Sequence, residues 1–170
     1  MTPRRNTRTP SAVEVDLAPV MAASRLITAA VVQSLSAVNR SVTVPQLRVL
    51  VMLATHGRLH LTAVATGLGV NASNASRTCD QLVAAGLVDK QVDPHDRRRA
   101  SLALTQRGRS LVADVMAHRE RLLAAVVAEM PPAGQRRLVA ALQEFTLAAT
   151  AMAAEDAPAG LEGDLAIWAT

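Results

Sequence analysis

Aromatic side chains are almost absent from this chain of 170 residues, which contains one Phe, one Trp and no Tyr. The core must therefore be built from aliphatic side chains, since 50% of the residues are hydrophobic and mean hydropathy is +0.21. Ala and Leu lead the ranking of helix propensities, so this composition predicts a mainly helical fold. A flat aromatic effector would find few rings to stack on, which favours an aliphatic or anionic ligand.

Cysteine is represented by Cys79 alone, which excludes an internal disulfide framework. Helical periodicity places this thiol on an inward face without a neighbouring base or cation, so a buried structural cysteine is expected rather than a redox sensor. The histidines lack the spacing and carboxylate neighbours of a metal site. No nucleophile–base pair, glycine-rich phosphate loop or pair of acids indicates catalysis. We therefore expect no enzyme, no metal and no cofactor.

No apolar run approaches the roughly 20 residues that a membrane-spanning helix needs. The N-terminal segment carries arginines but lacks the apolar stretch of a secretion signal. Residues 1–10 are rich in Pro, Thr and Arg and are expected to form a disordered basic arm, while residues 156–170 form a C-terminal tail. These features predict a cytoplasmic protein with no membrane partner.

Positive charge comes almost entirely from arginine, because Lys90 is the only lysine among 18 basic residues. The net charge is +4 and the sequence pI is about 10.9. The planar guanidinium fork binds phosphates and base edges in pairs, so a basic, arginine-rich chain fits a nucleic-acid partner. Arginine-rich codon usage explains the charge by itself equally well.

Capping residues and apolar periodicity divide the chain into six helices. The residues expected to cap helix N-termini are Thr43 (in a capping box with Gln46), Thr62, Asn71 and Thr105. The glycines expected to end helices are Gly57, Gly69 and Gly86. The helices are expected at about 11–39, 43–56, 62–68, 71–85, 105–130 and 133–155. A short extended piece is expected at 58–61, and Leu138, Leu142, Phe145 and Ala149 are expected to face inward from the last helix.

A β-hairpin is predicted between the fourth and fifth helices. Residues 88–92 and 100–104 alternate as strands do, and Pro94 fixes the intervening turn. Two short helices joined by a tight turn form a helix-turn-helix, and a following hairpin makes it winged. The long helices at both ends of the chain have nothing of their own to enclose, which favours a homodimer.

The residues between Thr43 and Arg109 resemble the MarR family of bacterial transcriptional regulators. The similarity is carried by Thr43–Leu47, Leu68–Ser73, Arg77, Asp80, Leu82, Gly86–Val88, Asp93–Arg98 and Leu104–Arg109. It implies a homodimeric repressor that binds palindromic operators and releases them when a small molecule or oxidant arrives. It also implies a winged helix-turn-helix DNA-binding domain over 43–105 and a helical dimerisation region formed by 11–42 and 106–155.

By this resemblance the helix over 71–85 enters the major groove of double-stranded DNA. The residues expected to contact DNA from it are Ser73, Asn74, Ser76 and Arg77. Arginine suits guanine, asparagine suits adenine, and serine hydroxyls suit bases or phosphates. Ser73 and Asn74 are equally suited to satisfying free N–H groups of the helix. Ala72, Asn74 and Ala75 depart from the common pattern, so the operator sequence stays open.

The hairpin tip carries the second set of expected DNA contacts. Asp96 is expected to pair with Arg98 and hold the tip, while Arg98 or Arg97 enters the minor groove, where negative potential is concentrated. Arg99 is expected to contact phosphate or to be plain surface charge. The alternative is a solvated run of charges on an exposed turn.

A small-molecule effector is expected to bind where the first two helices meet the long helix after the hairpin. Arg25, Arg48 and His118 are the polar residues expected there, and each is equally suited to ordinary surface. An effector would act by changing the separation of the two recognition helices, which must lie about 34–36 Å apart on DNA. The alternative functions are a winged-helix protein–protein interaction module and a ligand carrier without operator binding.

Overall fold

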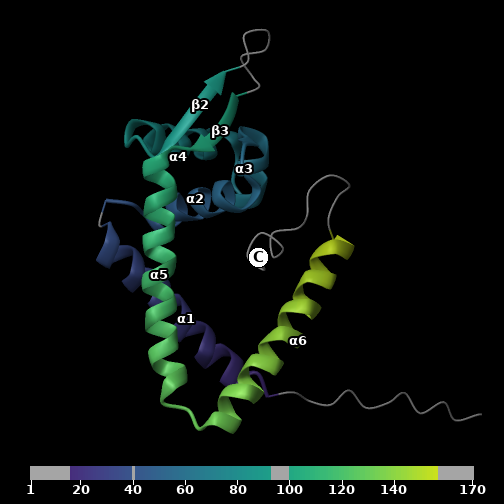
Figure 1. Ribbon diagram of the computed structural model, residues 1–170. Helices are drawn as coiled ribbons and strands as arrows, with labels where there is room; N and C mark the ends of the chain where they lie inside the picture. Colours follow the sequence, from purple (N-terminus) through teal and green to yellow (C-terminus); the bar gives the residue numbers. More distant parts are fainter. Residues whose placement is uncertain (1–15, 40, 93–99, 157–170) are drawn as a thin grey trace, which may run out of the picture.

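The computed structural model describes residues 16–39, 41–92 and 100–156 of the chain. Within these ranges the fold is mainly helical with a small antiparallel sheet, as the sequence predicts (Figure 1). The helices are α1 (Ala18–Val38), α2 (Val44–His56), α3 (Leu61–Leu68), α4 (Ala72–Ala84), α5 (Gln106–Ala128) and α6 (Pro132–Asp156). The strands are β1 (Leu59–His60), β2 (Val88–Val92) and β3 (Ala100–Leu104).

Three of the predicted N-caps form as expected. The Thr43 backbone N–H donates to Gln46 Oε1 over 2.8 Å, and Gln46 N–H donates back to Thr43 Oγ1 over 3.4 Å, which completes the capping box of α2. Asn71 Oδ1 accepts from the backbone N–H at position 74 over 2.9 Å. Thr105 Oγ1 accepts from the backbone N–H at position 108 over 3.0 Å. The predicted C-terminal glycines have φ of +73° at Gly57, +66° at Gly69 and +68° at Gly86.

The predicted cap at Thr62 is wrong. Helix α3 begins at Leu61, and its N-cap is His60, which makes no side-chain capping bond. The reason is that β1 ends at His60 with extended backbone, so the strand passes directly into the helix. Thr62 instead lies in the first turn, where its carbonyl accepts from Thr66 Oγ1 over 3.1 Å.

The sheet has the strand order β1-β3-β2, so the second hairpin strand is the central one. Strand β3 pairs with β2 from Val88↔Leu104 to Val92↔Ala100, and with β1 at Leu59↔Leu102. The pairing of β1 was not expected from the sequence. It attaches the hairpin to the segment between α2 and α3, and therefore to the helix-turn-helix.

The core of the lobe formed by α2, α3, α4 and the sheet consists of aliphatic side chains and one thiol. Its largest fully buried members include Leu50, Leu82, Leu87, Leu102 and Val115. Val115 belongs to α5, whose N-terminal half closes this core. Helix α5 is therefore part of the same packed unit as the helix-turn-helix.

The junction between the lobe and α5 is tight. Thr105 N–H donates to the Leu87 carbonyl over 3.1 Å, and Thr105 Oγ1 donates to the Gly86 carbonyl over 2.9 Å. Gly108 lies so close that a Cβ there would overlap the Leu87 carbonyl oxygen and lie 3.2 Å from Leu104 Cδ2. The Leu-Thr-x-x-Gly pattern thus encodes a helix cap followed by a close helix–backbone contact.

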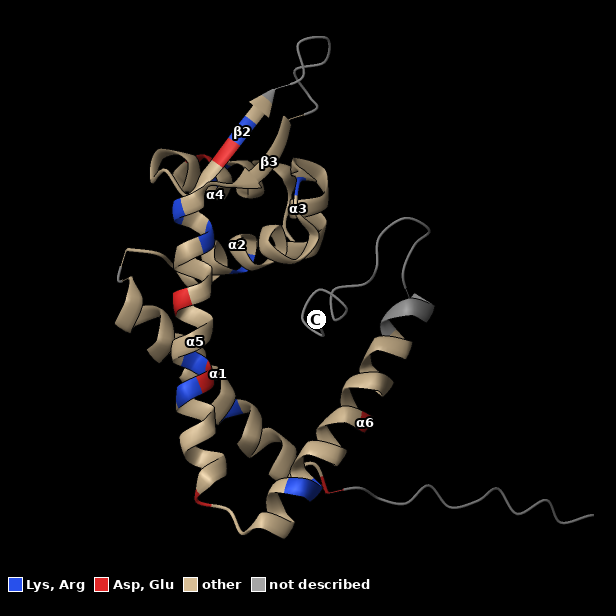
Figure 2. Ribbon diagram, viewed as in Figure 1, with Lys and Arg blue, Asp and Glu red and all other residues tan. Residues whose placement is uncertain are grey.

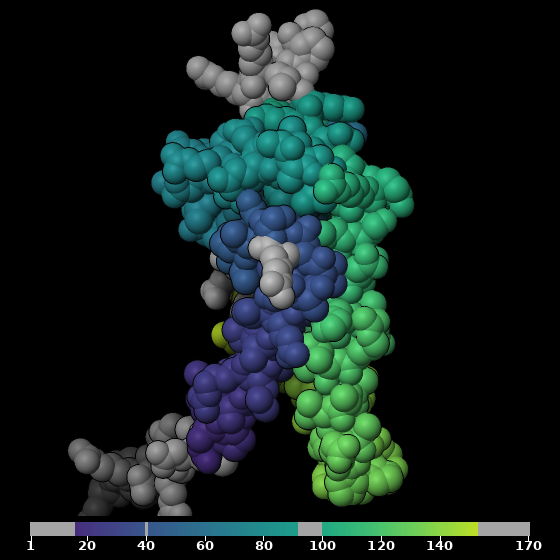
Figure 3. Space-filling view, turned by 90° about the vertical axis from the view of Figure 1, so that its left-hand side faces the viewer, coloured from purple at the N-terminus to yellow at the C-terminus, as the bar shows by residue number. Residues whose placement is uncertain are grey.

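Helices α1 and α6 leave most of their apolar surface uncovered. In α1 only Ala30, Ser34 and Leu35 are buried, and the helix diverges from α5 toward its N-terminal end (Figure 3). Helix α6 stands apart as the second arm of a V with α5 (Figure 1). The expectation of an inward face on α6 is wrong for the single chain, because Leu142 is 49% exposed and Phe145 is 61% exposed. Within the described residues no element covers them.

Helix α1 is apolar in composition although most of it is exposed. By length and composition alone it is apolar enough to cross a membrane, with 21 residues and a window of mean hydropathy 1.4. Its abundance of Ala, Val, Leu and Ile raises the average even though Ser, Thr, Gln and Arg interrupt every apolar run. Only 17% of that window is buried within the chain, so most of the helix surface is available to a partner.

Candidate nucleic-acid interface

Helix α4 has one apolar and one polar face. Ala75, Cys79 and Leu82 are fully or almost fully buried against the lobe. Ser73, Asn74 and Arg77 are exposed, and Ser76 is half-buried. An open hollow of about 570 Å³ on the outer face is lined by Ser73, Ser76, Arg77, Asp80, Gln81 and Ala84. The structure thus places Ser73, Ser76 and Arg77 around one hollow, with Asn74 exposed beside it.

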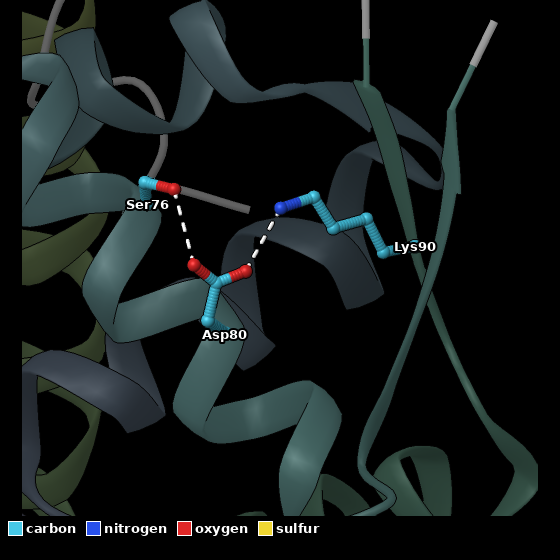
Figure 4. Close-up of polar contacts among 3 residues, drawn as sticks. All are labelled: Ser76, Asp80 and Lys90. Atoms are coloured by element: carbon cyan, nitrogen blue, oxygen red, sulfur yellow. Dashed lines mark hydrogen bonds and ion pairs between the residues drawn. The ribbon is translucent and has the colours of Figure 1, made fainter. Parts of the chain in front are cut away.

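An ion pair joins the outer face of α4 to the hairpin. Lys90 Nζ of β2 lies 2.8 Å from Asp80 Oδ1, and Ser76 Oγ donates to Asp80 Oδ2 over 3.2 Å (Figure 4). The hydrogen bond from Lys90 is the largest of the effects that lower the pKa of Asp80 below its ordinary value. The only lysine of the chain thereby joins the hairpin to α4.

The same bridge determines what Ser76 offers to a ligand. An ionised carboxylate only accepts hydrogen bonds, so the Ser76 proton points toward Asp80. The oxygen lone pairs of Ser76 are then left for another donor. The Ser73 hydroxyl makes no hydrogen bond within the described part of the chain and is free to rotate.

A second polar contact joins α4 to α2. Gln46 Nε2 of α2 donates to Gln81 Oε1 over 3.0 Å. The sequence motifs did not single out Gln81, Lys90 or this contact, because each depends on elements that are distant along the chain. The only available signal was the i, i+4 spacing of Ser76 and Asp80 on a predicted helix.

The hairpin is tied to the loop after α2 near the outer end of its described strands. Arg58 Nη1 donates to Gln91 Oε1 over 2.9 Å and to Ser101 Oγ over 3.2 Å, which links it to both hairpin strands. The predicted tip residues Asp96, Arg97, Arg98 and Arg99 lie outside the described residues. The described part of the hairpin ends next to them, on the side of the lobe that carries α4 (Figure 1).

Charge is distributed unevenly along the chain. Figure 2 shows long uncharged stretches on α1 and α6, whereas charged residues recur along β2 and α5. Among the described residues no group of three or more His, Cys, Asp or Glu side chains could hold a metal ion.

Cys79 is fully buried on the inner face of α4, as the periodicity predicts. Burial, with a smaller contribution from the charge of Asp80, raises the pKa of Cys79 to about 11. The thiol is thus protonated at neutral pH, which makes it a poor nucleophile toward oxidants.

The three residues expected around an effector have separate surroundings. Arg25 is exposed on α1, Arg48 Nη2 donates to the Gly67 carbonyl over 3.2 Å, and His118 Nδ1 lies 3.5 Å from Arg121 Nη2. A hollow of about 610 Å³ does open between α2, β3 and α5, but none of the three lines it. Its lining consists of Leu53, Ala54, Gly57, Arg58, Ala103, Leu104, Arg109, Val112 and Ala113.

Arg119 is a half-buried cation that the sequence analysis did not single out. Its Nε has no hydrogen-bond partner within the described residues, and burial lowers its pKa. It lies four residues after the buried Val115, on the face of α5 that the apolar spacing already marks as inward. That spacing was the signal that would have identified it.

Comparison with known proteins agrees with this geometry. The sequence model of the MarR family matches residues 40–99, from the start of the helix-turn-helix to the hairpin. The crystal structure of RV1404 from Mycobacterium tuberculosis is 40% identical, with a TM-score of 0.73, over 83% of this chain and 97% of that one. The chain belongs to the MarR family.

Two further relatives carry regulator names. The HTH-type transcriptional regulator YfiV of Bacillus subtilis is 31% identical over 67 residues, which are 39% of this MarR-family chain and 42% of the length of YfiV. The PcaV transcriptional regulator of Streptomyces coelicolor, whose crystal structure contains its natural ligand, is 27% identical. Its TM-score is 0.53 over 81% of this chain and 99% of that one.

Proposed function

We propose that this MarR-family chain is a sequence-specific DNA-binding transcriptional regulator. The observation that carries the proposal is the outer face of α4, where Ser73, Ser76 and Arg77 surround one open hollow beside the hairpin. A helix-turn-helix inserts the N-terminal part of this helix into the major groove. The helix-turn-helix regulator name of YfiV, a relative that matches over 67 residues, supports the same function.

Each residue of α4 has a distinct role in this proposal. Arg77 donates two hydrogen bonds to O6 and N7 of a guanine, and Asn74 pairs with an adenine. Ser76 presents lone pairs, so it accepts from the amino group of an adenine or a cytosine. Ser73 accommodates either a base or a phosphate.

The hairpin tip is proposed to reach the minor groove next to the α4 contact. Asp96 holds Arg98, and Arg98 or Arg97 inserts where the groove is narrow. Arg99 contacts the phosphate backbone. The Asp80–Lys90 ion pair supports this arrangement, because it keeps the hairpin strand and the recognition helix in a fixed relation.

The regulator is proposed to be a homodimer that reads a palindrome. Exposed apolar side chains on α1 and α6, among them Leu26 (67% exposed), Phe145 (61%) and Leu147 (72%), need a cover that a second copy supplies. This cover also explains the membrane-like composition of α1 without a membrane, which fits the proposed cytoplasmic location. Residues 11–42 and 106–155 form the dimerisation region, and residues 43–105 form the DNA-binding domain.

The output is proposed to be repression that a small molecule relieves, without catalysis. PcaV, 27% identical, was crystallised with its natural ligand, and the hollow between α2, β3 and α5 is large enough for a small molecule. A ligand that prefers a different separation of the two recognition helices shifts the population away from DNA. Arg25, Arg48 and His118 remain candidates for contacts in the neighbouring helical region.

A mobility-shift titration on DNA upstream of the chain's own gene, repeated at rising salt, tests the proposal. Specific binding should weaken steeply with salt, as expected when each neutralised phosphate releases counterions. The variants R77A and R98A should each lose about 1–3 kcal/mol of binding free energy. If the wild-type chain binds all duplexes weakly and with equal affinity, the result favours a protein–protein interaction module or a ligand carrier.

A further inference from the structure

The side chain of Gln81 has a hydrogen-bond direction that is fixed from a distance. The chain of contacts begins at the capping box of α2, where the backbone N–H of Thr43 donates to Gln46 Oε1 over 2.8 Å. A backbone N–H is only a donor, so the oxygen of the Gln46 amide must face it. The Gln46 NH₂ group is consequently turned the other way.

This orientation passes to the recognition helix. Gln46 Nε2 donates to Gln81 Oε1 over 3.0 Å, so the oxygen of the Gln81 amide must face α2. The Gln81 NH₂ group then faces away from α2. Gln81 is exposed and lines the hollow on the outer face of α4, together with Ser76 and Arg77.

We propose that Gln81 donates a hydrogen bond from Nε2 to a phosphate oxygen of the bound DNA, and that Gln46 is the positioning residue that fixes this direction. The inference rests on the proposed DNA-binding function and adds a contact to it. Phosphate is the chosen acceptor because Gln81 lies beyond the N-terminal half of α4, which reads base edges. Amide side chains commonly make such backbone contacts, which set register without reading sequence.

Elsewhere around the hollow, Ser76 presents a hydrogen-bond acceptor instead of a donor. There Asp80 accepts a hydrogen bond from Ser76 Oγ, whose lone pairs are left as acceptors. The face of α4 therefore presents an acceptor at Ser76 and a donor at Gln81. Asp80 of α4, which is paired with Lys90 of β2, sets the first, and Gln46 of α2 sets the second.

The first test removes the donor. A fluorescent duplex from the chain's own upstream region and a random duplex of equal length are titrated with wild type and Q81A at several salt concentrations. Losing one hydrogen bond should weaken binding by about threefold to tenfold per subunit, to a similar extent on both duplexes. The salt slope should stay unchanged, because glutamine releases no counterion. R77A serves as the matched control on the same helix and should lower the preference for the upstream duplex.

The second test reverses the orientation of the Gln81 amide by a substitution in α2, so that no residue on the outer face of α4 is changed. Q46E keeps the capping box, in which glutamate serves as well as glutamine, so the thermal midpoint should not fall. It puts an acceptor against Gln81, whose amide must turn and direct its oxygen at the phosphate. Q46E should therefore weaken binding more in the wild-type background than in the Q81A background, where only the added charge acts.

The outcomes separate the two levels of the proposal. Unchanged affinity in Q81A together with a weakened R77A would refute the Gln81 contact and leave the proposed function intact. Equal effects of Q46E in both backgrounds would refute the positioning role of Gln46. A wild-type chain that binds neither duplex would refute the DNA-binding function itself.

Discussion

The substitution Gly108→Ala tests the junction between the lobe and α5. Gly108 is the third residue of α5, and a Cβ there would overlap the Leu87 carbonyl oxygen and lie 3.1 Å from the Leu87 carbonyl carbon. Neither atom belongs to a flexible side chain, so α5 must move away from the backbone segment that leads into β2. Overpacking of this kind costs about 1–3 kcal/mol, and weakening the Thr105–Leu87 hydrogen bond adds about 1 kcal/mol.

A gain in helix propensity offsets part of this cost. Alanine is more favourable than glycine in a helix by roughly 1 kcal/mol, so Gly108→Ala should lower the free energy of unfolding by about 2 kcal/mol. Gly134 provides a matched control, because it is the third residue of α6 and its Cβ would meet only Met130 Cε at 3.4 Å and neighbouring atoms farther away. Gly134→Ala should leave stability unchanged or raise it by up to about 1 kcal/mol.

Urea unfolding followed by circular dichroism, at one protein concentration for all variants, measures both effects. Equal concentrations matter because association contributes to apparent stability. A Gly108→Ala variant as stable as the Gly134→Ala variant would show that the close approach of Gly108 to Leu87 is absent in solution, and would refute a tight junction between the lobe and α5.

Three further predictions concern α4 and its contacts. Asn71→Ala should lower the free energy of unfolding by about 1 kcal/mol through loss of the N-cap, whereas Asn71→Asp should retain it in the same urea assay. Because the pKa of Asp80 is lowered in the fold, its ionisation stabilises the protein above the ordinary carboxyl pKa, and this stability is lost as pH falls through the lowered value. Lys90→Met should raise the Asp80 pKa toward its ordinary value, which an NMR titration of the Asp80 carboxyl measures. An Asp80 pKa that is the same in wild type and in this variant would contradict the ion pair. Cys79, with its pKa raised to about 11, should react with iodoacetamide at neutral pH only after unfolding; rapid labelling of the native chain would contradict its burial.

Local chemistry explains which parts of this fold the sequence predicts. The caps at Thr43, Asn71 and Thr105 each join groups three residues apart, so the bonds depend on little beyond the segment itself. The strand bounds of the hairpin are likewise confirmed, since the alternation within residues 88–92 and 100–104 is a local signal.

Contacts between distant elements explain what the sequence did not predict. The pairing of Leu59 with Leu102 and the bridge from Asp80 to Lys90 exist only once the lobe has folded. Thr62 has good capping chemistry, but the strand that ends at His60 overrides it. The apolar stripe of α6 is visible in the sequence, but a periodic pattern does not say whether its cover comes from the same chain or from another.

The contacts of the first turn of α5 with Gly86 and Leu87 couple the orientation of this helix to that of the lobe. Its 23 residues extend about 35 Å from the junction at Thr105 and Gly108. A tilt of about 5° at one end moves the other by about 3 Å over that length. Because the first turn is bonded and packed against Gly86 and Leu87, the tilt cannot be absorbed at the junction. Movement of the far end of α5, where α6 begins, would therefore shift the position of α4.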